Sequence, residues 1–177
     1  QGGAAGLNSS TEESNWVISG CRIKAMGVKL SPRTRLQVHN SLLLVHSLSI
    51  AGDGTTAEFK NNVIMAHACG FDLGESAGWK SDTHFTLTNN TIVVVSNSVG
   101  APWLFRFGYT DSLPAKTLHI EARNNLIAMD GGPVHGHVMI NTTVNPDNPS
   151  AIDWQSEGNL YCPFPLLGET TKGADGK

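Results

Sequence analysis

The chain has 177 residues, of which 40% are hydrophobic and 15% are charged, and its formal net charge is −3. This length and apolar content suffice for one domain with a buried core. The slightly acidic balance provides no basic stripe for nucleic acid, and no apolar run approaches the roughly 20 residues of a membrane span. We therefore expect one folded domain that binds no nucleic acid and has no membrane span.

The two ends of the chain differ from its middle. Residues 1–14 are rich in Gly and Ser and predict a linker or flexible arm, and polar residues 168–177 predict a flexible tail. Residues 15–167 contain no internal linker and are predicted to form one domain. The start at Gln1 without a Met indicates a processed chain or a piece of a longer one.

Cysteine and histidine spacing predicts neither a disulfide framework nor a metal centre. Cys21, Cys69 and Cys162 are too few and too scattered for a framework, so we expect three free thiols. His46 and His67 share a repeat position without an evident third ligand, and a lone His-x-His at residues 135–137 is a weak signal. We predict no metal and no cofactor.

A short polar step recurs between two apolar runs. It is seen at Gly20-Cys21, Asn40-Ser41, Asn61-Asn62, Asn89-Asn90, Asn124-Asn125 and Gly158-Asn159. The second residue of each step, called the anchor, falls at positions 21, 41, 62, 90, 125 and 159, with spacings of 20, 21, 28, 35 and 34. Self-similarity at a period of about 20 residues or more is typical of a solenoid.

Residues before each anchor alternate between apolar and polar, which predicts a strand with one buried face. The apolar positions, five and three residues before the anchor, hold Trp16/Ile18, Leu36/Val38, Ala57/Phe59, Phe85/Leu87, Ile120/Ala122 and Trp154/Ser156. The polar positions between them include the column Gln37, Glu58, Thr86, Glu121 and Gln155.

Two further strands are predicted in each unit. The second follows the anchor, and its inward positions hold Ile23/Ala25, Leu43/Val45, Ile64/Ala66, Ile92/Val94, Ile127/Met129 and Tyr161/Pro163. The third is short and covers residues 28–30, 48–50, 71–73, 105–107 and 138–140. Asn tolerates left-handed backbone and its amide can bond to the next Asn in a stack. The sequence therefore predicts a parallel β-helix of about six coils with an Asn ladder at one corner.

The repeats at residues 85–93 and 118–127 resemble those of right-handed parallel β-helix proteins, the pectate-lyase-like superfamily. The resemblance covers about residues 15–165 and implies a carbohydrate-associated protein, extracellular or on the cell surface, with a sugar groove along the sheet of third strands. No catalytic signature of the superfamily is present, so whether the chain is an enzyme stays open.

The outward column of this groove would hold Lys29, Ser49, Asp72, Arg106 and Met139. Stacking places Asp72 beside Arg106. Such a pair could bind an acidic sugar or act as the acid–base pair in polysaccharide cleavage. An ordinary surface ion pair is the alternative. Insertions at residues 74–83, 96–102, 108–116 and 141–152 would wall the groove, and from them and the adjoining strands we predict Trp79, Lys80, Asp82 and Trp103 as further sugar contacts.

The outward face of the second strands is unexpectedly apolar. Its predicted contact residues are Leu42, Leu44, Val63, Met65, Val93 and Leu126. A sheet buried on both faces has continuous apolar runs of this kind, and an apolar patch of this length is rarely exposed to solvent on a monomer. Either a segment of the chain itself or another protein chain or domain would cover it. The competing function is therefore a structural or assembly module that uses this face for protein contact.

Overall fold

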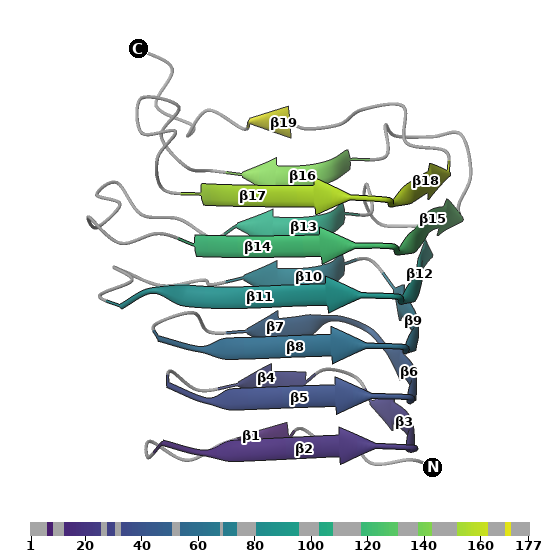
Figure 1. The fold of residues 1–177 in the computed structure, drawn as a ribbon. Helices are drawn as coiled ribbons and strands as arrows, with labels where there is room; N and C mark the ends of the chain where they lie inside the picture. The colour runs from purple at the N-terminus through teal and green to yellow at the C-terminus, as the bar shows by residue number, and fades with distance from the viewer. Residues whose placement is uncertain are drawn as a thin grey trace.

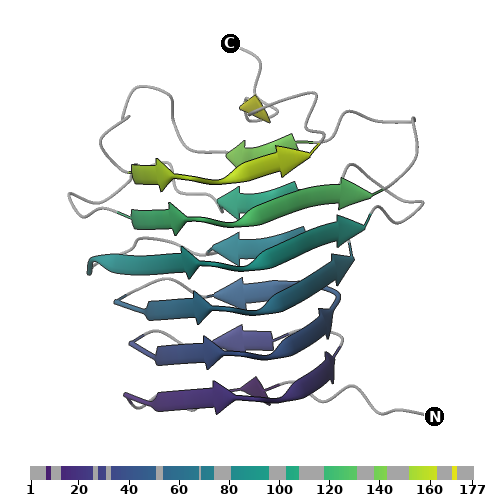
Figure 2. The ribbon, with the colours of Figure 1, turned by 45° about the vertical axis from the view of Figure 1, so that its right-hand side comes forward.

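The computed structural model describes the greater part of the repeat region. The residues that it describes are 7–8, 13–25, 28–30, 33–50, 54–67, 69–73, 81–95, 103–107, 118–130, 138–142, 152–162 and 169–170. Their strands form three parallel sheets that the chain visits in rotation, rising by one coil at each turn (Figures 1 and 2). Followed from β2 through β3 to β4, the coil in Figure 1 is right-handed. The predicted parallel β-helix is confirmed.

Each sheet takes one strand from every coil. Sheet A contains β1 (Leu7–Asn8), β4 (Val28–Leu30), β7 (Leu48–Ile50), β10 (Cys69–Leu73), β13 (Trp103–Phe107), β16 (Val138–Thr142) and β19 (Glu169–Thr170). Sheet B contains β2 (Asn15–Ser19), β5 (Arg35–His39), β8 (Thr56–Lys60), β11 (Thr83–Thr88), β14 (Leu118–Arg123) and β17 (Ile152–Glu157). Sheet C contains β3 (Arg22–Ala25), β6 (Leu42–Val45), β9 (Val63–His67), β12 (Thr91–Val95), β15 (Leu126–Asp130) and β18 (Leu160–Cys162).

The register of sheets B and C is the one that the anchors predict. Phe85 pairs with Ala57 and Ile120, and Ile92 pairs with Ile64 and Ile127, so like positions stack from coil to coil. These inward side chains are buried and form one continuous core. Phe71 lies at its centre, with ring centroids 4.9 to 5.5 Å from those of Phe59, Phe85 and Phe105.

The anchors form the predicted ladder at the corner between sheets B and C. Asn62, Asn90 and Asn125 are each 2% exposed, and each donates its backbone N–H to the amide oxygen of the next anchor at 2.9 Å. Ser41 continues the ladder because its N–H donates to Asn62 Oδ1 and its hydroxyl accepts the N–H of Cys21. The ladder thus satisfies polar groups that the corner buries.

The residue before each anchor has left-handed backbone. Asn40, Asn61, Asn89 and Asn124 have φ between 51° and 55°, and Gly20 and Gly158 take the same place in the outer coils. Asn and Gly are the residues that tolerate this conformation best, which explains the composition of the polar step.

Sheet A corrects one expectation and extends the fold. Arg106 pairs with Asn141, so the prediction that Met139 continues the column of Arg106 is wrong by two residues. Strand β1 pairs with β4, and β19 pairs with β16, so both predicted arms contribute a short strand to sheet A. The predicted domain boundaries stay a prediction.

Candidate functional site

The predicted groove column exists as a register column of sheet A. Lys29 pairs with Ser49, Ser49 with Asp72, and Asp72 with Arg106. Ser49 and Asp72 are half-buried, and the Oδ1 atom of Asp72 is shielded from solvent. The structure thus brings Asp72 and Arg106 to adjacent positions, and their predicted chemical role stays a prediction.

The predicted walls of that groove are only partly described. Trp79 and Lys80 lie outside the described residues. Asp82 is exposed immediately before β11, a central strand of sheet B, and Trp103 begins β13, where it pairs with Cys69 and Val138. Of the predicted thiols, Cys21 and Cys162 are free and exposed.

Sheet B carries a hollow that the sequence reasoning missed. It has a volume of about 160 Å³ and is lined by His84, Phe85, Thr86, His119, Ile120, Glu121, Asp153 and Gln155. His84, His119 and Asp153 share one register position on three successive strands. That position lies six residues before each anchor, one residue before the strand positions considered in the sequence analysis. Polar residues recur there, and this recurrence could have indicated the hollow.

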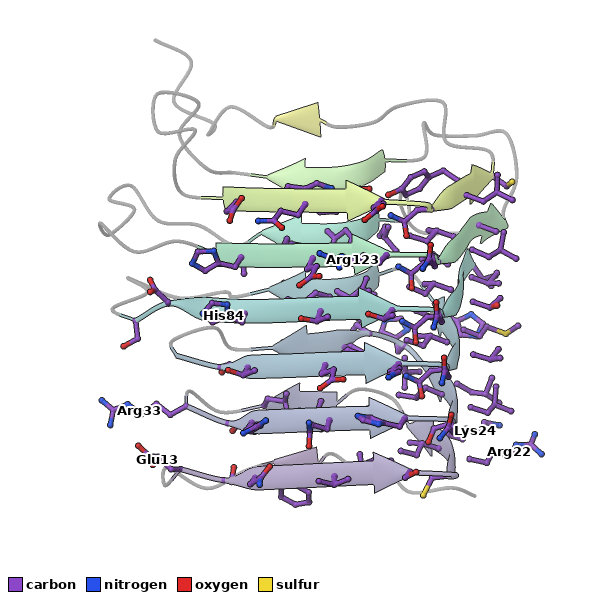
Figure 3. All side chains as sticks on the ribbon, in the orientation of Figure 1. Glu13, Arg22, Lys24, Arg33, His84 and Arg123 are labelled. Carbon is purple, nitrogen blue, oxygen red and sulfur yellow. The ribbon has the colours of Figure 1, made fainter. Side chains whose placement is uncertain are left out.

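Polar contacts hold the side chains of this hollow in place. The imidazole rings of His84 and His119 stack, with centroids 4.5 Å apart and planes within 6° of parallel. His119 Nδ1 lies 3.2 Å from Asp153 Oδ2, which the amide of Gln155 also approaches at 3.5 Å. Figure 3 shows His84 near the start of the strands and Arg123 toward their end.

The charge of the hollow is dominated by two carboxylates. Glu121 Oε1 lies 2.7 Å from Arg123 Nε, whereas Asp153 contacts the His119 imidazole and the Gln155 amide. The Asp153 contact favours the His119 tautomer with its proton on Nδ1, which leaves Nε2 as an acceptor. The hollow therefore offers carboxylate and imidazole acceptors together with amide and hydroxyl donors.

The outward face of sheet C is apolar, as expected. Val63, Met65, Leu126 and Leu160 are 47%, 37%, 40% and 60% exposed. Two register columns make up this face, which we call the sheet C face. The first contains Arg22, Leu42, Val63, Thr91, Leu126 and Leu160, and the second contains Lys24, Leu44, Met65, Val93, Ala128 and Cys162.

Comparisons of the chain with known proteins found no match. No protein-family model, curated protein or solved structure matches the chain. Within the described ranges, no three His, Cys, Asp or Glu side chains are grouped so as to hold a metal ion. The described part of the chain also contains no helix long and apolar enough to cross a membrane.

Proposed function

We propose that the chain is a carbohydrate-binding β-helix module that holds a neutral stretch of polysaccharide on sheet B. The hollow around His119 and Asp153 is the observation that carries this proposal, because it gathers donors and acceptors on rigid strands. The resemblance of the repeats to the pectate-lyase-like superfamily supports it. A protein that binds polysaccharide in this way would act outside the cell or on its surface.

The chemistry of the hollow suits sugar hydroxyls, which both donate and accept hydrogen bonds. Asp153 and Glu121 accept, and the Gln155 amide donates. The stacked imidazoles add ring surface for the C–H face of a sugar ring. Side chains already fixed by the sheet lose little further freedom when a ligand binds.

The size of the hollow favours one unit of a longer chain. Pockets that enclose a whole drug-sized ligand have volumes of about 300–1,000 Å³, whereas this hollow measures about 160 Å³ and is open to solvent. The polar columns of sheet B continue along the solenoid to Glu58 and Gln37, where the Gln37 amide donates to Glu58 at 3.1 Å. An extended ligand would therefore find further polar groups beyond the hollow.

Charge separates this site from the predicted groove on sheet A. Two carboxylates and one guanidinium surround the hollow, so a uronate or sulfated sugar would be repelled there. The column with Lys29 and Arg106 would favour such acidic sugars instead. Ligand preference therefore reports which sheet binds.

A glycan array with neutral, uronate-containing and sulfated oligosaccharides tests the proposal. We expect a neutral oligosaccharide to bind, and we expect Gln155→Ala to weaken its binding about 2- to 12-fold, since a typical hydrogen bond contributes about 0.5–1.5 kcal/mol net. Gln37→Ala is the comparison variant, because it removes the same residue type from the same column four coils away, and it should weaken binding of a short oligosaccharide less than Gln155→Ala does.

Two results would overturn the assignment to sheet B. One is the absence of binding to every sugar on the array. The other is binding of acidic sugars alone that disappears in Asp72→Asn or Arg106→Gln and survives Gln155→Ala.

Cleavage of an acidic polysaccharide bound along sheet A, with Asp72 and Arg106 as the acting pair, is a second proposal, favoured by their adjacent register positions. A reducing-sugar assay on the bound polysaccharide would detect it. Release that Asp72→Asn abolishes would support an acid–base role for this pair, and the absence of release would leave a binding module.

A further inference from the structure

We infer that the polysaccharide lies along the solenoid axis on sheet B, with one sugar unit per coil, and that it is an extended neutral glycan whose rings are joined through equatorial bonds, as in cellulose. This inference rests on the proposed sugar site and names the class of its ligand. Three observations carry it: the long direction of the hollow, the polar columns that continue it, and the spacing of the strands.

The hollow is longer across the strands than along them. Its outward-facing lining comes from three successive strands, β11, β14 and β17, and each strand contributes two outward positions. Parallel strands repeat at about 4.8 Å, so the outer two strands lie about 10 Å apart, whereas two successive outward positions of one strand lie about 7 Å apart. The long direction of the hollow is therefore the direction of the solenoid axis.

Two polar register columns, which we call the sheet B track, continue the hollow toward the N-terminal coils. The first contains Arg35, Thr56, His84, His119 and Asp153, and the second contains Gln37, Glu58, Thr86, Glu121 and Gln155. All of these side chains are exposed or half-buried. On β2 the second column reaches Val17, which is 64% exposed and has no hydrogen-bonding side chain. The track therefore extends from β5 to β17.

Side chains of the sheet B track contact one another from coil to coil. The Gln37 amide donates to Glu58 at 3.1 Å at one end of the track. At the other end the rings of His84 and His119 stack, and His119 Nδ1 lies 3.2 Å from Asp153 Oδ2. These contacts run parallel to the solenoid axis and hold the side chains in place. A ligand that follows the axis therefore meets groups that are already ordered.

The spacing of the coils matches an extended sugar chain. Figure 1 shows the strands of sheet B stacked in nearly the same direction, and parallel strands repeat at about 4.8 Å. A ring joined to its neighbours through equatorial bonds advances the chain by a similar length, so successive units stay in register with successive coils. The unit seated in the hollow lies over β14, and its neighbours lie over β11 and β17.

The two columns of the track match the width of such a chain. They lie about 7 Å apart, so they flank the rings at the two edges where the hydroxyl groups project. In a starch-type chain an axial bond turns each unit relative to the last, and the chain coils away from a straight track. The geometry therefore favours the equatorially linked class.

The charge of the whole track favours a neutral chain, as it does in the hollow alone. Glu58, Glu121 and Asp153 are carboxylates, whereas Arg35 carries the guanidinium of the track. A chain with a uronate on every unit would place a negative charge near each of these carboxylates, which repel it. Neutral hydroxyl groups can instead donate hydrogen bonds to them, and bonds to a charged acceptor are the stronger kind.

Isothermal titration calorimetry of the full chain with oligosaccharides of increasing length tests the inference. The probes are neutral cello-, xylo- and manno-oligosaccharides, with malto-oligosaccharides as the axially linked comparison. In the series that binds, affinity should rise at least about fourfold from trisaccharide to pentasaccharide, since each added unit gains about one hydrogen bond worth about twofold or more. A hexasaccharide should gain less than about twofold further, because the track ends at β5.

A variant at the far end of the track tests the direction of the bound chain. Gln37→Ala should lower the ratio of pentasaccharide to trisaccharide affinity about 2- to 12-fold, because Gln37 lies on β5, four strands from Gln155. Val17→Ala is the matched control, since Val17 continues the same column one strand beyond the track, and it should leave both affinities unchanged. Thermal unfolding would confirm that each variant folds.

The outcomes distinguish failure of this inference from failure of the proposed function. Trisaccharide binding that Gln155→Ala weakens, with no gain for the pentasaccharide or no effect of Gln37→Ala on the ratio, would overturn the axial track and leave the sugar site in place. Equal affinity for the malto-oligosaccharides would overturn the equatorially linked class. The absence of binding to every neutral sugar would overturn both the inference and the proposed function.

Discussion

Asn90 provides the sharpest test of what holds the coils together. Its side chain is 2% exposed and forms four hydrogen bonds within the corner. Oδ1 accepts the backbone N–H of Asn62 at 2.9 Å and its side-chain amide at 3.1 Å. Nδ2 donates to the carbonyl of Phe59 at 2.9 Å and to Asn125 Oδ1 at 3.0 Å. One side chain thus joins three successive coils.

Replacement of Asn90 by Ala removes all four bonds and adds no new partner. The N–H of Asn62 and the carbonyl of Phe59 each lose a buried partner, and each such loss costs about 1–3 kcal/mol. We therefore expect Asn90→Ala to lower the free energy of unfolding by about 2–6 kcal/mol, out of a total that is typically about 5–15 kcal/mol. Asn90→Ser should lie between Ala and wild type, because Ser41 shows that a hydroxyl can occupy the ladder.

Urea unfolding followed by circular dichroism measures this effect. With a slope of about 2 kcal/mol per M, the midpoint of Asn90→Ala should fall by about 1–3 M. Asn89→Gly is the matched control, because Asn89 is exposed and its φ of 55° suits Gly without strain. A midpoint for Asn90→Ala within about 0.3 M of wild type would refute the claim that the ladder secures the corner.

Substitutions at four further positions have defined outcomes. Phe71→Ala should cost about 3–5 kcal/mol in urea unfolding, since its ring contacts three others in the core, and Phe71→Leu should cost clearly less. Gly70→Ala should cost about 1–3 kcal/mol because its Cβ would lie 2.7 Å from the carbonyl oxygen of Leu104. Gly20→Ala, with open space around it, should show only the strain of its φ of +65° in the same assay. Glu121→Ala removes an exposed ion pair and should change stability by less than about 1 kcal/mol, while weakening sugar binding in the array assay.

The anchors made most of the fold predictable from the sequence. Period-two alternation and the left-handed Asn step are local signals, and each assigns a residue to the core or to the outside without knowledge of distant contacts. Phe85 and Leu87 could be placed in the core, and Asn90 in the ladder, for this reason. The apolar outward positions of sheet C were predictable on the same grounds.

Sheet A was less predictable because variable segments separate it from the anchors. The strand at residues 138–140 was predicted from its short apolar pattern alone, which placed Met139 in the column of Arg106, where Asn141 lies. The hollow on sheet B was missed for a different reason. His84, His119 and Asp153 are unremarkable one by one, and only the pairing of three strands brings them together.

The proposed sugar site can be tested most directly by nuclear magnetic resonance. The imidazole signals of the protein would be followed while the neutral oligosaccharide that binds best on the array is added. Binding in the hollow predicts shifts for His84 and His119, which line it, and none for His67, which is exposed on β9 of sheet C. Unchanged signals of His84 and His119 at a saturating sugar concentration would contradict the site.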